Sequence, residues 1–373
     1  MGCSATTSSC RETLVFADEK QHFRIPALLY VKEWQTFLAF AEKRTSPKDE
    51  DANNLVMSKG TRQPDGSLQW SPTEDVKEAA KDGYRTMNPC PVFERNSKTL
   101  FLFFICIEGK TPENQLKPGQ TRLCYVTSTD HGVTWSDLTD LTSTVNFTNY
   151  QTFAVGPGHG IQLSSGTLLV PAYVKVGSGK SVKPHAVVLR SEDQHTWKAG
   201  QPITMESGEC QLAEVSDGKG GRQVYLNARS TGAPKPRVEA LSDDGGASFT
   251  LFTPLNRKLE ETPTGCQGSV LGRSSETGLL FSHPTRGEGP DRLDLGVYLR
   301  KSLQDTDPWG EPHIIHPGPS GYSDLTCCEE EGHFGCLMEC GHEKRLHIVF
   351  KEFDVKEILH IVNHSDVDRG EAV

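Results

Sequence analysis

The sequence predicts an all-β fold, and three observations lead to that prediction. The chain holds 35 glycines and 22 prolines among its 373 residues, which favours many turns over long helices. Short apolar runs recur along the whole chain at the length and spacing of β-strands. A turn pattern also repeats through the middle of the chain. Together these features indicate a turn-rich β protein built from repeated units.

The repeated turn pattern has a serine, an aspartate, a glycine and an aromatic residue at fixed positions. Ser128–Trp135 and Ser242–Phe249 are full copies, and Ser191–Trp197 is one residue shorter and lacks the glycine. Glycine permits a positive φ in a tight turn, and aspartate accepts hydrogen bonds from nearby backbone amides. The aromatic side chain can then pack into the core. We predict a structural role, and no chemistry, for these aspartate boxes.

The three box aspartates, Asp130, Asp193 and Asp244, are 63 and then 51 positions apart, which suits one four-stranded propeller blade for each unit. We therefore predict a single six-bladed β-propeller domain over residues 16–363. A flexible segment, 1–15, precedes it, and a polar tail, 364–373, follows it. Short helices are predicted at Glu74–Lys81 and Val355–Ile361. Strands are predicted at Ala27–Tyr30, Phe37–Ala41, Leu100–Ile107, Leu123–Thr127, Leu168–Val174, Ala186–Leu189, Gln223–Asn227, Leu279–Ser282, Gly296–Leu299 and Leu346–Phe350.

The net charge limits the classes of partner. The 39 lysines and arginines minus the 49 aspartates and glutamates give −10, which argues against nucleic acid because phosphate binding needs a basic surface. An anionic ligand would gain no long-range attraction from such a chain. Its binding would have to rely on a local basic pocket.

The pattern of cysteines argues against a zinc site, and the lengths of the apolar runs bear on where the protein is located in the cell. The cluster Cys327, Cys328, Cys336 and Cys340 lacks the histidine pattern typical of zinc sites, so we predict reduced thiols. No apolar run approaches the roughly 18 to 20 residues that cross a bilayer, and the N-terminus lacks the apolar core of a secretory signal. We expect a protein that is not secreted by the usual route.

The first six residues carry a possible lipidation signal. Gly2 in second place and Thr6 in sixth place fit the myristoylation pattern. Cys3 could carry a second acyl chain, and stable anchoring requires two such signals. The alternative is an ordinary flexible tail. The sequence thus predicts either peripheral attachment to a plasma or internal membrane through Gly2 and Cys3, or a cytoplasmic protein.

Three arginines stand in distinctive phrases of the chain. Arg24 lies in Phe-Arg-Ile-Pro, Arg229 in Asn-Ala-Arg-Ser and Arg292 in Asp-Arg-Leu-Asp-Leu-Gly. Three guanidinium groups can hold one carboxylate from several sides, which suits an acidic sugar as ligand. Arg237 is the main rival for Arg229, and we predict that it lies on the surface.

These phrases, with several others, resemble the vertebrate exo-α-sialidase (neuraminidase) family from about Phe16 to about Phe350. The segments Phe103–Cys106 and Glu329–Leu337 are most similar to the membrane-associated members that act on gangliosides. The resemblance implies a glycosidase that removes terminal sialic acid from glycolipids and glycoproteins, without a metal or organic cofactor. The remaining motifs that carry it are Phe23–Pro26, Phe40–Arg44, Thr86–Pro91, Thr152–His159, Gly265–Ser269 and Gly321–Leu325.

The resemblance also implies three catalytic residues. Tyr322 is the expected nucleophile, because the anomeric carbon of sialic acid bears a carboxylate that would repel an anionic nucleophile. A tyrosine with an ordinary pKa needs a base, and Glu214 matches that position. Glu209 is its rival, and strand alternation would turn the two glutamates to opposite faces. Asp49 matches the acid/base that serves the leaving oxygen.

The substrate-binding positions also follow from the resemblance. Arg24, Arg229 and Arg292 would grip the substrate carboxylate, Glu339 would orient the first arginine, and Arg44 would add a further contact. The family often has a second aromatic residue two positions after Tyr173, whereas this chain has Lys175. Matches for the rest of the sugar are Met87 and Asn88 for the N-acetyl group, Glu113 for the glycerol hydroxyls, and Tyr173 and Gln267 for the aglycone and ring.

Two other functions share part of this pattern. A propeller with aspartate boxes can serve as a lectin, and an arginine pocket can hold an acidic sugar without cleaving it. The joint presence of Tyr322, Glu214 and Asp49 favours an enzyme. A trans-sialidase would use the same residues, but no separate lectin domain or acceptor platform is apparent, so hydrolysis is favoured.

Overall fold

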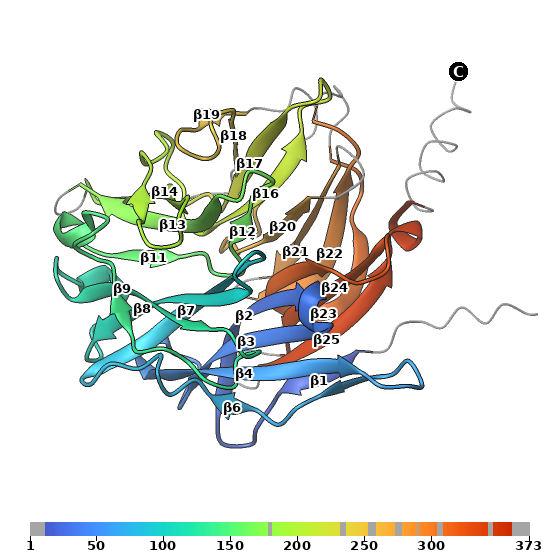
Figure 1. Ribbon diagram of the computed structural model, residues 1–373, viewed down its shortest axis with the longest axis horizontal. Coiled ribbons are helices and arrows are strands. Elements are labelled where there is room, and N and C mark those ends of the chain that lie inside the picture. Colours follow the sequence, from blue (N-terminus) through green and yellow to red (C-terminus); the bar gives the residue numbers. More distant parts are fainter. Residues whose placement is uncertain are drawn as a thin grey trace, which may run out of the picture.

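The computed structural model describes residues 12–177, 181–231, 236–252, 259–272, 278–288, 291–303, 309–341 and 346–359. Within these residues the strands form five hydrogen-bonded sheets. Figure 1 shows that the sheets follow one another around the molecule in chain order, from the blue strands through green and yellow to red. The predicted all-β class is confirmed, in a propeller-like arrangement of sheets. Gly2, Cys3 and the 364–373 tail lie outside the described residues.

The first two sheets hold the N-terminal third of the chain. The first has the order β2-β3-β4-β5, with β6 paired to β4, and comprises β2 (His22–Val31), β3 (Thr36–Arg44), β4 (Ala52–Arg62), β5 (Leu68–Trp70) and β6 (Glu74–Asp75). The second has the order β10-β9-β8-β7 and comprises β7 (Tyr84–Glu94), β8 (Thr99–Glu108), β9 (Thr121–Ser128) and β10 (Thr139–Asp140).

The third and fourth sheets continue the series. The third has the order β11-β13-β14-β15, with β12 paired to β13, and comprises β11 (Phe153–Val155), β12 (Ile161–Gln162), β13 (Leu168–Val176), β14 (Lys183–Ser191) and β15 (Lys198–Ala199). The fourth has the order β16-β17-β18-β19 and comprises β16 (Cys210–Ser216), β17 (Arg222–Ala228), β18 (Val238–Ser242) and β19 (Thr250–Leu251).

The fifth sheet joins the two ends of the described chain, because β1 pairs with β25. Its order is β1-β25-β24-β23-β22-β21-β20. Its strands are β1 (Thr13–Phe16), β20 (Ser269–Gly272), β21 (Leu279–Glu288), β22 (Asp291–Arg300), β23 (His313–Cys327), β24 (His333–Cys340) and β25 (His347–Asp354). Short 3-10 helices lie between strands: η1 (Lys32–Trp34), η2 (Asp49–Asp51), η3 (Glu113–Gln115) and η4 (Phe147–Asn149).

The ten predicted strands all lie within observed strands, apart from Leu346, which directly precedes β25. The helix predicted at Glu74–Lys81 is wrong. Residues 74 and 75 pair with β4 instead, and the Val76 amide donates to Leu55 O at 2.9 Å, so the backbone is committed to the first sheet. The second helix prediction is confirmed over 355–359. No helix among the described residues is long and apolar enough to span a bilayer.

Three turns share one pattern of hydrogen bonds. In each, an aspartate accepts from the backbone amide and from the side-chain hydroxyl of a residue three or four positions further on. The pairs are Asp130 with Thr134 (2.9 and 2.6 Å), Asp193 with Thr196 (2.6 and 2.7 Å) and Asp244 with Ser248 (2.9 and 2.6 Å). Partners close in the sequence thus satisfy these carboxylates, of which Asp193 and Asp244 are exposed and Asp130 is partly buried.

The aromatic residue after each turn packs against the preceding sheet. Trp135 lies edge-on to Phe40 of the first sheet, with ring centroids 6.3 Å apart. Trp197 lies edge-on to Phe103 of the second sheet at 4.7 Å. Phe249 packs with the apolar cluster that includes Leu169 of the third sheet. The turns therefore connect successive sheets through burial of large rings.

Buried side chains link the sheets at the centre of the molecule. The Asp324 carboxylate on β23 accepts from the Ser269 hydroxyl on β20 and from the Leu28 amide on β2, both at 2.7 Å. His159 Nδ1 lies 2.7 Å from the same carboxylate. Because Leu28 belongs to the first sheet and His159 lies between β11 and β12, the Asp324 carboxylate ties the fifth sheet to two other parts of the chain.

Candidate active site

Three strands bulge where they reach the central pocket. The pairing register shifts between Arg24 and Ala27 in β2, between Met87 and Cys90 in β7, and between Ser320 and Ser323 in β23. The first two bulges contain Pro26 and Pro89, and proline within a sheet is confined to bulges and edges because it cannot donate to the ladder. A bulge re-aims the side chains beside it. The bulges thus place Arg24, Asn88 and Tyr322 on the pocket wall.

Two bulge residues hold a left-handed backbone, which is tolerated by asparagine but unusual for isoleucine. Ile25 has a φ of 60° and Asn88 a φ of 59°, and a β-branched residue rarely adopts this region. Buried carboxylates hold both amides: Ile25 N donates to Glu339 Oε1 at 2.8 Å, and Asn88 N donates to Glu42 Oε1 at 2.7 Å. Backbone strain of this kind concentrates at functional sites.

The bulges open onto a cavity of about 710 Å³ at the centre of the molecule. Four predicted residues, Glu214, Arg44, Gln267 and Glu339, do not line it. Nine predicted residues do line it: Arg24, Asp49, Met87, Asn88, Glu113, Tyr173, Arg229, Arg292 and Tyr322.

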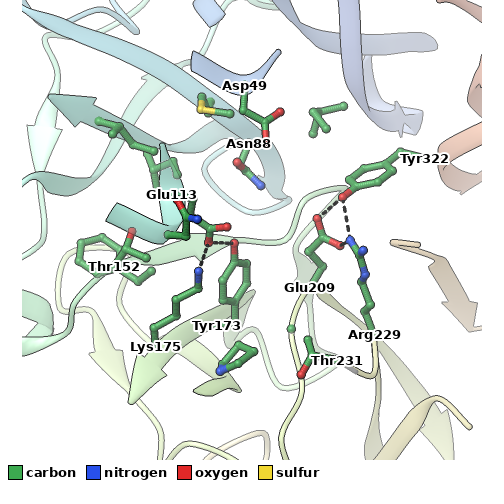
Figure 2. A pocket seen from close by; sticks show the side chains of 18 of the residues that line it. Asp49, Asn88, Glu113, Thr152, Tyr173, Lys175, Glu209, Arg229, Thr231 and Tyr322 are labelled. Carbon is green, nitrogen blue, oxygen red and sulfur yellow. Dashed lines mark hydrogen bonds and ion pairs between the residues drawn. The ribbon is translucent and has the colours of Figure 1, made fainter. Parts of the chain in front are cut away.

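Tyr322 forms a closed triangle with Glu209 and Arg229 (Figure 2). Its hydroxyl donates a short hydrogen bond to Glu209 Oε1 and accepts one from Arg229 NH1 at 3.2 Å. Arg229 NH1 also lies 2.8 Å from Glu209 Oε2. Burial, and then the charge of Glu209, raise the pKa of Tyr322 well above its ordinary value, although the arginines act in the opposite direction. The phenol therefore stays protonated, with a proton acceptor already in contact.

The prediction of Glu214 as the base is wrong in its geometry, and its rival Glu209 occupies the site. Glu214 accepts from Ser164 N at 3.0 Å and from Ser164 Oγ at 2.8 Å, away from the pocket. Glu209 directly precedes β16, whereas Glu214 lies five residues further on, about 16 Å at the rise of a strand. Glu209 thus lies at the pocket end of β16, and Glu214 lies further along the strand, away from the pocket.

Two further arginines lie over the Tyr322 ring. The guanidinium carbon of Arg24 is 5.6 Å from the ring centroid, and that of Arg292 is 5.4 Å away. Arg24 Nε donates to Glu339 Oε1 at 2.8 Å, as predicted for the orienting acid. Arg292 Nε is buried without a hydrogen-bond partner among the described residues. A buried donor without a partner is costly, so the site suits an anionic ligand.

Two glycines allow this close packing. Gly265 has a φ of +65°, and a Cβ there would lie 2.8 Å from Arg229 Nε. The space lets Arg229 NH2 donate to Thr264 O at 2.8 Å. A Cβ on Gly321 would collide with the Glu339 carboxylate, which accepts from Tyr322 N at 3.0 Å.

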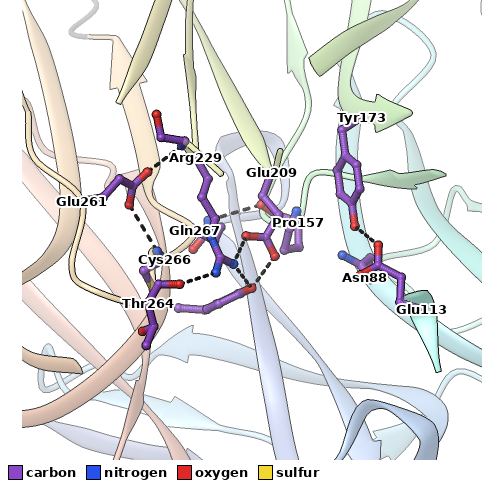
Figure 3. A network of polar contacts seen from close by, with 12 residues as sticks. Asn88, Glu113, Pro157, Tyr173, Glu209, Arg229, Glu261, Thr264, Cys266 and Gln267 are labelled. Atoms are coloured by element: carbon purple, nitrogen blue, oxygen red, sulfur yellow. Dashed lines mark hydrogen bonds and ion pairs between the residues drawn. The ribbon is translucent and has the colours of Figure 1, made fainter. Parts of the chain in front are cut away.

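The prediction that Arg237 lies on the surface is wrong, because its side chain is fully buried. It lies 3.0 Å from Glu261 and donates to Cys266 O at 2.7 Å. Glu261 in turn accepts from Ser230 N at 2.8 Å, beside Arg229 (Figure 3). Burial disfavours the charged form, but the charge of Arg237, the contact with His283 and the Ser230 amide together outweigh it, and the pKa of Glu261 falls to about 2. This pair supports Arg229 from behind.

Asp49 stands at the opposite side of the pocket mouth from Glu209 (Figure 2). It belongs to η2, its side chain is 61% exposed, and Oδ1 accepts from Arg44 NH1 at 2.6 Å. Arg44 itself is fully buried and also binds Glu42 Oε2 at 2.5 Å. The expected contact of Arg44 with the ligand is therefore wrong: its guanidinium is occupied by Glu42 and Asp49, behind the wall.

The wall opposite Tyr322 carries Glu113, Tyr173 and Lys175 (Figure 2). Glu113 Oε1 accepts from Tyr173 Oη at 3.2 Å and lies 3.0 Å from Lys175 Nζ. Burial and the charge of Glu113 raise the pKa of Tyr173 well above its ordinary value. This hydroxyl therefore remains a neutral donor. Met87 and Asn88 line the pocket between the two walls.

Gln267 is packed behind the pocket rather than in it, so its expected ligand contact is wrong. Its amide donates to Ser323 O at 3.0 Å and to Pro157 O at 3.3 Å, and its oxygen accepts from Ser323 N at 3.2 Å (Figure 3). Gln267 thus holds the segment after Tyr322 and has no amide group left for a ligand.

The part of the chain that the structure describes contains neither a candidate metal-binding cluster nor a disulfide. No group of three or more histidine, cysteine, aspartate or glutamate side chains there could hold a metal ion. Cys327, Cys328, Cys336 and Cys340 are free thiols. The charged groups of the pocket are arginines, a lysine and carboxylates, and the tyrosines Tyr173 and Tyr322 lie among them.

Comparisons with known proteins identify the family. The BNR repeat-like domain model matches residues 35–336. The chain is 42% identical to Sialidase-3 of Bos taurus, over 90% of both chains, and 42% identical to Sialidase-2 of Mus musculus, over 95% of this chain and 97% of that protein. The Trypanosoma rangeli sialidase in complex with 2,3-difluorosialic acid, a covalent intermediate, shares the fold with a TM-score of 0.71 and 18% identity over 95% of this chain and 58% of that one. This chain belongs to the sialidase (neuraminidase) family of glycoside hydrolases.

Proposed function

We propose that the protein is a retaining exo-α-sialidase that hydrolyses terminal α-linked sialic acid from sialylated glycoconjugates. Tyr322 is the nucleophile, Glu209 its base and Asp49 the acid/base. The observation that carries the proposal is the contact of the buried Tyr322 hydroxyl with Glu209 and Arg229. A protein that only bound the sugar would have no use for a phenol with a carboxylate in contact with its proton.

Charge explains why a tyrosine suits this substrate. The sialic acid carboxylate would lie among Arg24, Arg229 and Arg292, where Arg292 Nε has no hydrogen-bond partner in the described part of the chain. A free carboxylate nucleophile at the same place would be repelled by the substrate anion. The raised pKa of Tyr322 keeps the phenol neutral until it attacks, and the arginines then stabilise the developing charge.

The proposed reaction has two steps. In the first, the Tyr322 oxygen bonds to the anomeric carbon, its proton passes to Glu209, and the bond to the leaving oxygen breaks as Asp49 protonates that oxygen. In the second, water attacks the same carbon as its bond to the Tyr322 oxygen breaks, Asp49 takes the water proton, and Glu209 returns its proton to the departing Tyr322 oxygen. Two displacements at one carbon retain the configuration.

We further infer that the preferred substrates are gangliosides, presented at a membrane to which acylated Gly2 and Cys3 attach the protein. The segments Phe103–Cys106 and Glu329–Leu337 and the myristoylation pattern support this. Cell fractionation of Gly2→Ala tests the attachment. Protein that sediments with membranes as fully as wild type would overturn it.

We also propose that the fold has six blades, in which the seven-stranded sheet counts as two. The first part of β23 pairs with β22, and Ser320 to Cys327 pair with β24, so β23 would join the two blades. The shared hydrogen bonds of Asp130, Asp193 and Asp244 support their assignment as aspartate boxes.

The test of the proposed function combines turnover and binding. Purified wild type and Tyr322→Phe are assayed with a fluorogenic α-sialoside, and binding of free sialic acid is measured for both. Turnover by wild type, lost in the variant while binding is retained, is the expected result. Binding without turnover by wild type, from acidic to neutral pH, would support a lectin instead.

A further inference from the structure

Lys175 is a cation on the pocket wall that the proposed reaction does not use. It lines the cavity opposite Tyr322, apart from the arginines that surround the phenol (Figure 2). Its side chain is only 18% exposed, whereas its partner Glu113 is 45% exposed. Both residues line the cavity, and Glu113 is the more exposed member of the pair.

The strand places Lys175 and Tyr173 side by side. Both belong to β13, two residues apart, so alternation turns their side chains to the same face. Val174 between them is buried on the other face. The Lys175 amide donates to Thr152 O at 2.9 Å, which fixes this part of the strand against the segment that precedes β11. Two donors therefore converge on Glu113 from one rigid element.

The loop that carries Glu113 is also fixed at its other end. Arg85 donates to Gly109 O at 2.6 Å and to Thr111 O at 2.7 Å. Its own side chain is buried on the pocket wall. Arg85 therefore holds the start of the loop, and Lys175 with Tyr173 hold the carboxylate that follows in η3.

The two contacts orient the Glu113 carboxylate. Both end on Oε1, which leaves Oε2 without a partner among the residues that the structure describes. Figure 2 shows this second oxygen directed toward the open space between the two walls. A carboxylate oxygen accepts hydrogen bonds only, so it selects a ligand group with hydroxyl donors. The charge of Lys175 also offsets that of Glu113, which would otherwise repel an anionic sugar.

We propose that Lys175 is a specificity-determining residue: it fixes Glu113 so that the free carboxylate oxygen selects a substrate with a hydroxyl-bearing tail on the side remote from the arginines. This inference rests on the proposed sialidase function and deepens it, because the tail in question is the hydroxylated side chain of the sugar. Lys175 acts through Glu113 and carries no role in the bond-breaking steps.

The experiment compares two aryl α-sialosides with the same leaving group. One has the intact three-carbon hydroxylated tail, and the other has the tail shortened by mild periodate oxidation and borohydride reduction. The quantity measured is the ratio of kcat/KM for the intact substrate to that for the shortened one. Loss of a hydrogen bond to a charged group predicts that wild type prefers the intact tail by about tenfold or more.

Five variants separate the role of Lys175 from a merely structural effect. Lys175→Met and Glu113→Gln should each bring the ratio close to one, and the double variant should lower it no further, because both act on one contact. Lys175→Arg should restore part of the preference. Lys183→Met is the matched control: Lys183 pairs with Glu206 at 2.8 Å on the hairpin of β13 and β14 but does not line the pocket. Its ratio should equal that of wild type.

The outcomes distinguish a failure of the proposed role of Lys175 from a failure of the proposed sialidase function. If wild type hydrolyses the substrates but Lys175→Met keeps the wild-type ratio, or loses activity equally on both, the role of Lys175 is overturned and the sialidase function stands. If wild type hydrolyses neither substrate, the proposed function fails and the inference fails with it.

Discussion

The pocket and the outer turns both gather carboxylates, but the partners of those carboxylates come from different distances in the sequence. At the pocket, Glu209 accepts from Tyr322, 113 positions away, and Glu339 accepts from Arg24, 315 positions away. In the turns, Asp130 accepts from residues three and four positions further on. A carboxylate whose partners are distant in the sequence depends on the whole fold for its geometry. A turn carboxylate depends only on residues that lie close to it in the chain.

This contrast has a consequence for the effect of substitutions. The turn aspartates satisfy backbone amides and seat an aromatic ring on the next sheet, so their loss should weaken the fold and leave the pocket unchanged. The pocket carboxylates contact a phenol and arginines, and these groups take no part in the hydrogen bonds of the turns. Their loss should reduce activity and leave the turns intact.

The largest effect is expected at Glu209. Glu209→Gln removes the proton acceptor of Tyr322 and should lower kcat by about 10² to 10⁴-fold. Glu214→Gln, in β16, is the matched control, and its rate should stay within about twofold of wild type, because the hydrogen bonds of the Glu214 side chain among the described residues go to Ser164. Steady-state kinetics on a fluorogenic sialoside measure both. A slow Glu214→Gln with an active Glu209→Gln would reverse the assignment of the base.

An intermediate effect is expected at Glu261, which supports the pocket without facing it. Glu261→Gln leaves Arg237 buried beside a neutral partner and should reduce the free energy of unfolding by about 3 kcal/mol. The pKa of Glu261 is lowered from 4.5 to about 2, so its stabilising contribution is complete above about pH 4.5 and is lost as the pH falls toward 2. Denaturant unfolding at several pH values should show the difference from wild type shrinking as the pH falls. A difference that stays constant would contradict the ion pair.

The smallest effect is expected in a turn. Asp130→Asn keeps one acceptor oxygen but removes the charge that Thr134 and Val133 stabilise. Hydrogen bonds from Thr134 lower the pKa of Asp130 to about 2, so the charge contributes at neutral pH and is lost under strongly acidic conditions. The melting temperature should fall by on the order of 1 °C, with kcat/KM unchanged. If Asp130→Asn lost activity while its melting temperature stayed that of wild type, the proposed division into structural turns and a functional pocket would be contradicted.

The contrast also explains which features could be predicted from sequence. Strands such as Leu100–Ile107 and the turn at Asp130 depend on residues close in the chain, so the local pattern predicts them. The motif around Tyr322 and the three arginines also place these residues correctly on the pocket wall. The choice between Glu209 and Glu214 failed because alternation describes the faces of a strand but not where the strand meets the cavity.

Other errors have the same physical origin. Arg237 and Gln267 stand in polar segments of the sequence that resemble surface or ligand-binding segments. In the structure both are buried: Arg237 pairs with Glu261, and Gln267 donates to the backbone of Ser323. Glu42 lines the pocket and holds the Asn88 amide, but nothing in its neighbourhood of the sequence indicates that contact. The sequence shows that Lys175 stands where the family often has an aromatic residue, but its partner Glu113 is 62 positions away and is known only from the fold.

The most direct test of the account is to trap the covalent intermediate. Wild type is incubated with 2,3-difluorosialic acid, which should transfer a 3-fluorosialyl group to the enzyme with loss of fluoride from the anomeric carbon, and the modified peptide is located by mass spectrometry. The account predicts one adduct, on Tyr322, that forms far more slowly in Glu209→Gln than in Glu214→Gln. An adduct on Glu209, or on any residue other than Tyr322, would contradict it.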